Sequence, residues 1–113
     1  MKEMLLSQRQ VGEVTVVDLE GGTDPEMRLA DLVESLLGEG HRNILLNLRG
    51  HGIDSNALGQ ATRCWIKTNR TGGVLKLATR QPKVWDLIRM LRLDRVIDCY
   101  RSEEEAIDGF ARS

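Results

Sequence analysis

Hydrophobic and polar positions along the chain form alternating blocks that predict strands and helices in turn. Residues 14–19 are β-branched and apolar and lie between glycines, which predicts a strand. Residues 4–6 predict a short edge strand that pairs with it. Residues 44–48 predict a buried central strand, and residues 74–78 and 96–100 predict two more. Between these blocks, apolar residues recur at the spacing i, i+3, i+4, which predicts crossover helices.

Capping residues indicate where each helix begins. Asp24-Pro25 predicts the first helix, with Asp24 as N-cap and proline at the first helical position. A second helix follows Asp54-Ser55-Asn56, a third begins at Pro82, and Ser102 with Glu105 forms a capping box for a fourth. The apolar stripes are Leu29, Leu32, Val33, Leu36 and Leu37; Leu58, Ala61 and Trp65; and Val84, Leu87, Ile88 and Leu91.

The order of elements is therefore β-β-α-β-α-β-α-β-α, which predicts the α/β class. Strands that alternate with helices form right-handed βαβ units and a largely parallel sheet. We expect one domain over residues 1–113, with a mixed, mostly parallel central sheet of four to five strands and about four helices.

Composition removes several functional classes. The 113 residues carry 16 basic and 17 acidic side chains, a net charge of −1, which argues against direct nucleic-acid binding. No apolar run is long enough to span a membrane. Cys64 and Cys99 lie far apart without a CxxC motif, and neither His41 nor His51 stands beside a cysteine. We therefore expect a reduced, cytoplasmic compartment, no metal site and no cofactor, with Cys64 as a packed core thiol.

The near-neutral total hides an uneven distribution of charge. Residues 1–60 hold ten acidic and five basic side chains, whereas residues 61–101 hold ten basic and three acidic ones. Two interpretations stay open: the charges form solvated helix faces, or they form a docking surface that orients a protein partner.

The segment over residues 48–59 is the part of the chain that suggests chemistry. A buried strand leads into a glycine-containing loop and then into Asp54-Ser55-Asn56 at a helix start. Ser55 would lie in the first helical turn, where free backbone N–H groups and the helix dipole favour a phosphate. The alternative is that these three residues only begin a helix, because Asp, Ser and Asn are preferred N-caps.

The order of these segments resembles the STAS domain of bacterial anti-sigma factor antagonists (anti-anti-sigma factors). The resemblance covers about residues 12–108 and is carried by the two strands at 14–19 and 44–48, the turn at 22–24, the stretch at 53–59, and the stretches at 71–77 and 84–97. The sequence departs from the family pattern at Asn56 and Ala57, and Arg92 stands where the family commonly has glycine near the end of the third helix.

This resemblance implies a regulatory protein-binding module rather than an enzyme. Its partner would be an anti-sigma factor of the histidine-kinase-like ATPase type, a serine kinase that phosphorylates Ser55 and thereby ends the complex. Asp54 matches the aspartate before that serine, and Asp24 matches an acidic residue that lies near it. The expected surroundings of the phosphorylation site are Asp24, Asp54, Asn56, Ala57, Leu58, Gly59 and Arg63.

Two alternatives remain. The first keeps the fold without phosphorylation, as a scaffold or interaction subunit of a signalling or transport complex, with Trp65 and Trp85 as candidate contact residues. The second is a small hydrolase in which Asp54 and Ser55 together with His51 would supply a nucleophile and a base, although no G-x-S-x-G motif or P-loop is present. The sequence leaves open whether the chain forms a homodimer.

Overall fold

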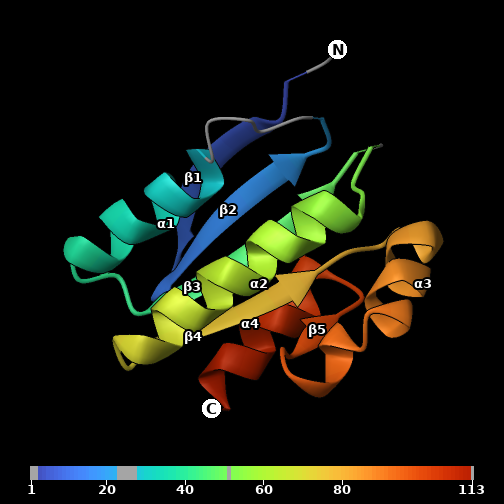
Figure 1. Cartoon of the computed structure of the whole chain (residues 1–113). Coiled ribbons are helices and arrows are strands. Elements are labelled where there is room, and N and C mark those ends of the chain that lie inside the picture. Colours follow the sequence, from blue (N-terminus) through green and yellow to red (C-terminus); the bar gives the residue numbers. More distant parts are fainter. Residues whose placement is uncertain (1–2, 23–27, 51, 113) are drawn as a thin grey trace.

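The strands and helices follow one another in the predicted order (Figure 1). The structure, a computed structural model, describes residues 3–22, 28–50 and 52–112. Its elements are β1 (Leu5–Val11), β2 (Val14–Glu20), α1 (Arg28–Gly38), β3 (Asn43–Arg49), α2 (Ser55–Arg70), β4 (Val74–Ala78), α3 (Pro82–Met90), a 3₁₀ turn η1 (Leu93–Arg95), β5 (Cys99–Tyr100) and α4 (Glu103–Ala111). The predicted start of the first helix at Asp24-Pro25 lies outside the described residues.

The five strands form one mixed sheet in the order β1-β2-β3-β4-β5. β1 and β2 form an antiparallel hairpin, and every later neighbour is parallel, which confirms the predicted mostly parallel sheet. Since each parallel connection moves one strand along in the same direction, right-handed crossovers place α1, α2 and α3 on one face. Leu29, Leu46, Leu58 and Ile88 from this layer and the sheet are fully buried together.

The opposite face is covered by α4 (Figure 1). Ala106 and Phe110 of α4 pack on Val16 of β2 and Leu45 of β3. Lys76 of β4 lies beneath the helix with its side chain only 4% exposed. Burial by itself lowers the pKa of Lys76. Its hydrogen bonds to the Tyr100 hydroxyl and the Asp98 carboxylate raise the pKa by a larger amount, so the net shift is upward and the ammonium stays charged.

Close packing between α4 and β5 requires a glycine at position 109. A Cβ atom at Gly109 would overlap the hydroxyl and the adjoining ring carbon of Tyr100. Tyr100 in turn accepts a hydrogen bond from the buried Lys76, at 3.1 Å. The absence of a side chain at 109 therefore lets the tyrosine reach over the lysine.

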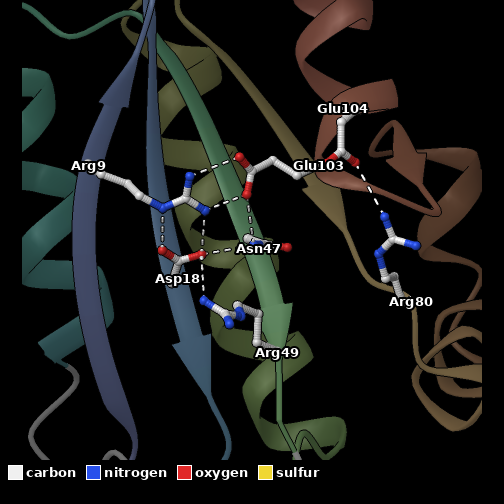
Figure 2. A network of polar contacts seen from close by, with 7 residues as sticks. All are labelled: Arg9, Asp18, Asn47, Arg49, Arg80, Glu103 and Glu104. Carbon is white, nitrogen blue, oxygen red and sulfur yellow. Dashed lines mark hydrogen bonds and ion pairs between the residues drawn. The ribbon is translucent and has the colours of Figure 1, made fainter.

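A polar network attaches the start of α4 to the sheet (Figure 2). The Arg9 guanidinium donates to both carboxylate oxygens of Asp18, at 2.8 and 3.0 Å, and to the carboxylate of Glu103. The Asn47 amide donates to Asp18 at 2.8 Å and to Glu103 at 3.3 Å. The network thus connects β1, β2 and β3 to the first residue of α4.

The charges in this network hold one another ionised. Hydrogen bonds from Arg9 lower the pKa of both Asp18 and Glu103, and those two carboxylates raise the pKa of Arg9. The Asp18 side chain is only 8% exposed, so its negative charge depends on these donors rather than on water. Sequence reasoning did not single out this network.

Three predicted boundaries were wrong in detail. β1 runs to Val11 rather than ending at Leu6, because most of its side chains face solvent and a polar segment is tolerated there. The last strand contains only Cys99 and Tyr100, since residues 93–95 form η1 and Ile97 turns into the core. α3 ends at Met90, and Leu91 is exposed instead of extending the apolar stripe.

The end of α3 contains a strained residue. Arg92 has φ 58° and ψ 28°, a left-handed conformation that is common for glycine directly after a helix. It is the one described residue other than glycine with a positive φ. Glycine adopts this backbone conformation without strain. For a residue with a Cβ atom, such as Arg92, the conformation costs roughly 1–2 kcal/mol.

Asp18→Asn is expected to lower the free energy of unfolding at pH 7 by about 1–3 kcal/mol, because a buried charge-assisted acceptor is lost. The stabilisation that goes with the lowered pKa of Asp18 is complete above the ordinary aspartate pKa of about 4 and is lost as pH falls from there through the lower pKa of the folded state. The difference between variant and wild type should therefore shrink as pH falls through and below 4 in urea titrations. Asp108→Asn changes an exposed carboxylate outside the network and should stay within about 0.5 kcal/mol of wild type. A pH-independent deficit for Asp18→Asn would contradict the assignment.

Arg92→Gly is expected to raise the free energy of unfolding by about 0.5–1 kcal/mol, because glycine adopts the left-handed conformation without strain. Arg92→Ala removes the same side chain but keeps a Cβ, so it should give no such gain. Chemical denaturation of the three proteins measures both effects. Equal stability of the glycine and alanine variants would show that the backbone is unstrained at this position.

Candidate functional site

The candidate site lies where β3 ends and α2 begins. β3 is buried between its neighbours β2 and β4, and its carboxyl end leads through residues 50–54 into α2. In open α/β sheets, functional groups gather at this edge. Ile53, Ala57 and Leu58 are buried and fix the segment to the core, while Asp54, Ser55 and Asn56 between them are exposed.

Asp54 is the N-cap of α2. Its backbone is extended, at φ −119° and ψ −176°, and its carboxylate accepts a hydrogen bond from the Ala57 backbone N–H at 2.9 Å. Ser55 is the first residue of the helix. By helix geometry the N–H groups of Ser55 and Asn56 have no acceptor in the preceding turn, and they point out of the helix end together with the dipole. An anion attached to Ser55 would meet favourable electrostatics from its own helix.

Glycines bring the loop before α2 close to the loop after β2. Gly50 and Gly52 both have positive φ, at 70° and 89°, so the chain makes turns that other residues would strain. A Cβ at Gly52 would lie 3.5 Å from the backbone of Gly21, which follows β2. The two loops are therefore adjacent at their described ends, whereas Asp24 and His51 lie outside the described residues.

The remaining predicted site residues divide into a buried and an exposed group. Ala57 is 2% exposed, so its methyl group lies in the core and does not face a partner. Gly59 and Arg63 are exposed and follow Ser55 at intervals of four residues, which places all three along one side of α2. Nothing lies within 4 Å of the position that a Gly59 Cβ would take. The helix surface next to Ser55 is thus open at Gly59.

The charged residues of α2 are all basic. The helix contains no acidic residue and carries Arg63, Lys67 and Arg70. Lys67 forms an ion pair of 3.3 Å with Glu34 of α1. Ile66, 40% exposed, adds an apolar contact surface among these cations. An acidic protein surface with an apolar centre would complement this side of the helix.

A cleft of about 450 Å³ opens at the carboxyl ends of β3 and β4, beside the start of α4. Its walls include Arg49, Arg80 and Gln81 on one side and Glu103 and Glu104 on the other. Arg80 and Glu104 are both exposed and form an ion pair of 3.4 Å across it (Figure 2). Positive and negative groups in the cleft neutralise each other, so it offers no surplus charge to a ligand.

The other residues considered for chemistry are structural in their placement. Cys64 is fully buried in the core, as predicted. Burial raises the pKa of the Cys99 thiol to about 12, which keeps it protonated at neutral pH. Trp85 is 8% exposed and donates its ring N–H to the Thr79 carbonyl at 2.9 Å, and Trp65 packs at the margin of the core. Over the described residues, no group of three His, Cys, Asp or Glu side chains could hold a metal ion.

Comparison with known families identifies the fold. Residues 8–106 match the STAS domain. The chain belongs to this family. No match was found among curated protein sequences. Within residues 3–22, 28–50 and 52–112, no helix of this STAS domain is long and apolar enough to cross a membrane.

Solved structures of low sequence identity share this fold. An anti-sigma factor antagonist from Mycobacterium paratuberculosis superposes with a TM-score of 0.81 at 16% identity, over 95% of this chain and 93% of the other. SpoIIAA of Bacillus, a cell fate determinant, superposes in its phosphorylated form with a TM-score of 0.67 at 19% identity, over 94% and 99%. Its unphosphorylated form, described as an anti-sigma factor antagonist, gives 0.74 at 18% identity, over 96% and 98%.

Sequence reasoning placed Ser55 in the first turn of a helix, which the structure confirms, but it missed Arg9, Asp18, Asn47 and Glu103. A signal was present in Asp18 and Asn47, which are polar residues inside strands predicted to be buried. Their partners could not be found this way, because Arg9 and Glu103 are 94 residues apart in the chain.

Asp54→Ala is expected to lower the free energy of unfolding by about 1 kcal/mol, within a range of roughly 0.5–2, because the Ala57 N–H loses its cap. Asp54→Asn should stay within a few tenths of wild type, since asparagine caps equally well. Urea unfolding at neutral pH compares the three proteins. If asparagine were as destabilising as alanine, the carboxylate charge rather than the hydrogen bond would be the stabilising feature.

Proposed function

We propose that this STAS domain is an anti-sigma factor antagonist that is switched by phosphorylation of Ser55. Unmodified, it binds an anti-sigma factor of the histidine-kinase-like ATPase type, which is also its serine kinase. Phosphorylation of Ser55 ends that complex. The domain acts by being bound and released, without catalysis of its own.

The observation that carries the proposal is the placement of Ser55. Its side chain is exposed at the first residue of α2, beside a loop held to the core by Ile53, so a kinase can reach the hydroxyl without unfolding the domain. The structural likeness to SpoIIAA, which has been solved in phosphorylated and unphosphorylated forms, also supports a switch by phosphorylation. Asp54 is occupied as the N-cap, which argues against its acting with Ser55 in hydrolysis.

The switch follows from electrostatics at the start of α2. A phosphate adds about 1.5 to 2 negative charges at neutral pH. The free domain accommodates them, because the helix N-terminus favours an anion. A partner surface whose acidic groups complement Arg63 and Arg70 would be repelled by the same charge, and burial of the phosphate in the interface would remove its water. The modification therefore weakens the complex while leaving the fold intact.

Incubation with ATP and a lysate of the source cells should add one phosphate to the wild-type domain, detected by intact-mass spectrometry and mapped by peptide sequencing. Ser55→Ala should remain unmodified. Ser35→Ala, which removes another exposed helical serine, is the matched control and should be modified like wild type. The proposal fails if wild type stays unmodified in a lysate that contains the kinase, or if Ser55→Ala still gains the phosphate.

Binding to the kinase purified from that lysate provides the second measurement. Ser55→Glu should weaken the complex at least tenfold, about 1.4 kcal/mol, while unfolding stability stays equal or rises by about 0.3–1 kcal/mol. Gly59→Gln should also weaken binding by filling the open side of α2, although it raises helix propensity. Unchanged binding of Ser55→Glu would favour a constitutive scaffold instead.

A further inference from the structure

The two edges of the sheet differ in length and exposure. At one edge, β5 contains only Cys99 and Tyr100. At the other, β1 has seven residues from Leu5 to Val11, of which five side chains are exposed and two are partly buried. Among the described residues, no strand lies beyond β1. An edge of this length presents a row of backbone groups that can pair with another strand.

β1 lacks the features that usually prevent such pairing. It contains no proline and no lysine, and its register with β2 runs without a bulge from Leu5↔Glu20 to Val11↔Val14. Its single charge is Arg9, whose guanidinium is bound over the sheet face by Asp18 and Glu103. The cation that could have protected the edge is therefore held in the network that attaches α4.

Hairpin geometry decides which backbone groups point outward. The turn at Gly12 and Glu13 closes the hairpin at the pair Val11↔Val14. In an antiparallel ladder, hydrogen-bonded and non-hydrogen-bonded pairs alternate, so residues 5, 7, 9 and 11 bond to β2. The backbone N–H and C=O groups of Leu6, Gln8 and Gln10 consequently face away from the sheet.

We propose that β1 pairs with β1 of a second copy of this chain, antiparallel, about a two-fold axis at Gln8. In this register Gln8 faces Gln8 of the other copy, and Leu6 faces Gln10. All three residues with outward backbone groups meet one another, and each pair exchanges two N–H···O bonds. The sheet of one copy then continues into the sheet of the other.

The side chains favour this register over its neighbours. Leu5, 52% exposed, faces the partly buried Val11 across the axis, so an apolar side chain loses its contact with water. Ser7 faces Arg9, which avoids like charges opposite each other. A shift of the axis to Arg9 would oppose two guanidinium groups, and a shift to Ser7 would leave Gln10 and Val11 without partner residues in β1. A strand that complements itself in one register favours a second copy as occupant.

Sedimentation equilibrium of the full chain, from low micromolar to millimolar concentration, should show a monomer–dimer equilibrium. Gln8→Pro should be monomeric over the whole range, because it removes an N–H that does not bond to β2 and proline is tolerated there on an edge strand. Gln8→Ala keeps the backbone donor and should dimerise like wild type. Circular dichroism checks that the proline variant keeps its fold.

Charge variants test the two-fold axis even if the proline variant fails to fold. Gln8→Lys and Gln8→Glu should each weaken the homodimer several-fold, because like charges face each other at the axis. An equimolar mixture of the two should recover dimers, which native mass spectrometry would resolve as the mixed species. Amide hydrogen exchange of wild type should slow at Leu6, Gln8 and Gln10 as concentration rises.

Wild type that stays monomeric at millimolar concentration would overturn the proposal. So would dimers unaffected by both charge variants, or exchange protection that appears elsewhere and leaves these three amides unchanged. A dimer is expected without phosphorylation or partner protein, so the outcome is independent of the role of Ser55.

Discussion

Right-handed crossover is the constraint on which the rest of this domain depends. Because strand order equals sequence order from β2 to β5, the three crossover helices must lie on one face of the sheet. The other face of the central strands also carries buried apolar residues, among them Val16 and Leu45, and must be covered by something else. α4 provides that cover, and its attachment depends on polar and charged side chains of β1, β2 and β3. The network is thus a consequence of topology: it compensates for a face that no crossover can reach.

At the start of α2, the residues that stabilise the fold are different from the residues that a partner could contact. The core on the α1–α3 side reaches the start of α2 through Ile53, Ala57 and Leu58, which hold the helix end in place. Between these anchors, Ser55 and Asn56 are exposed and can differ in chemistry without loss of packing, while Asp54 caps the helix. A modified serine there changes the charge of the surface and leaves the buried contacts unchanged. A domain of this size can therefore carry a switch on a rigid element rather than on a mobile segment.

Local pattern was sufficient for most elements and for the place of Ser55 in the first turn of α2. Periodicity located β2, β3 and β4, and capping chemistry located the starts of α2, α3 and α4, because both signals arise within a few residues. β1 was predicted too short because an edge strand with two exposed faces has no apolar alternation to detect. β5 was predicted too long because Val96 and Ile97 are β-branched, yet one is exposed and the other fills the core from a turn. The Arg9 network could not be predicted, since it depends on which distant residues the sheet brings together.

The contact between Tyr100 and Gly109 links two positions that sequence separates. While tyrosine stands at 100, only glycine fits at 109, and the hydroxyl that fills this space also serves the buried Lys76. A larger residue at 109 requires a smaller one at 100, and the lysine would then lose a partner beneath α4. A substitution at 109 would therefore act on Lys76 through Tyr100, so the effects of substitutions at these three positions should not be additive.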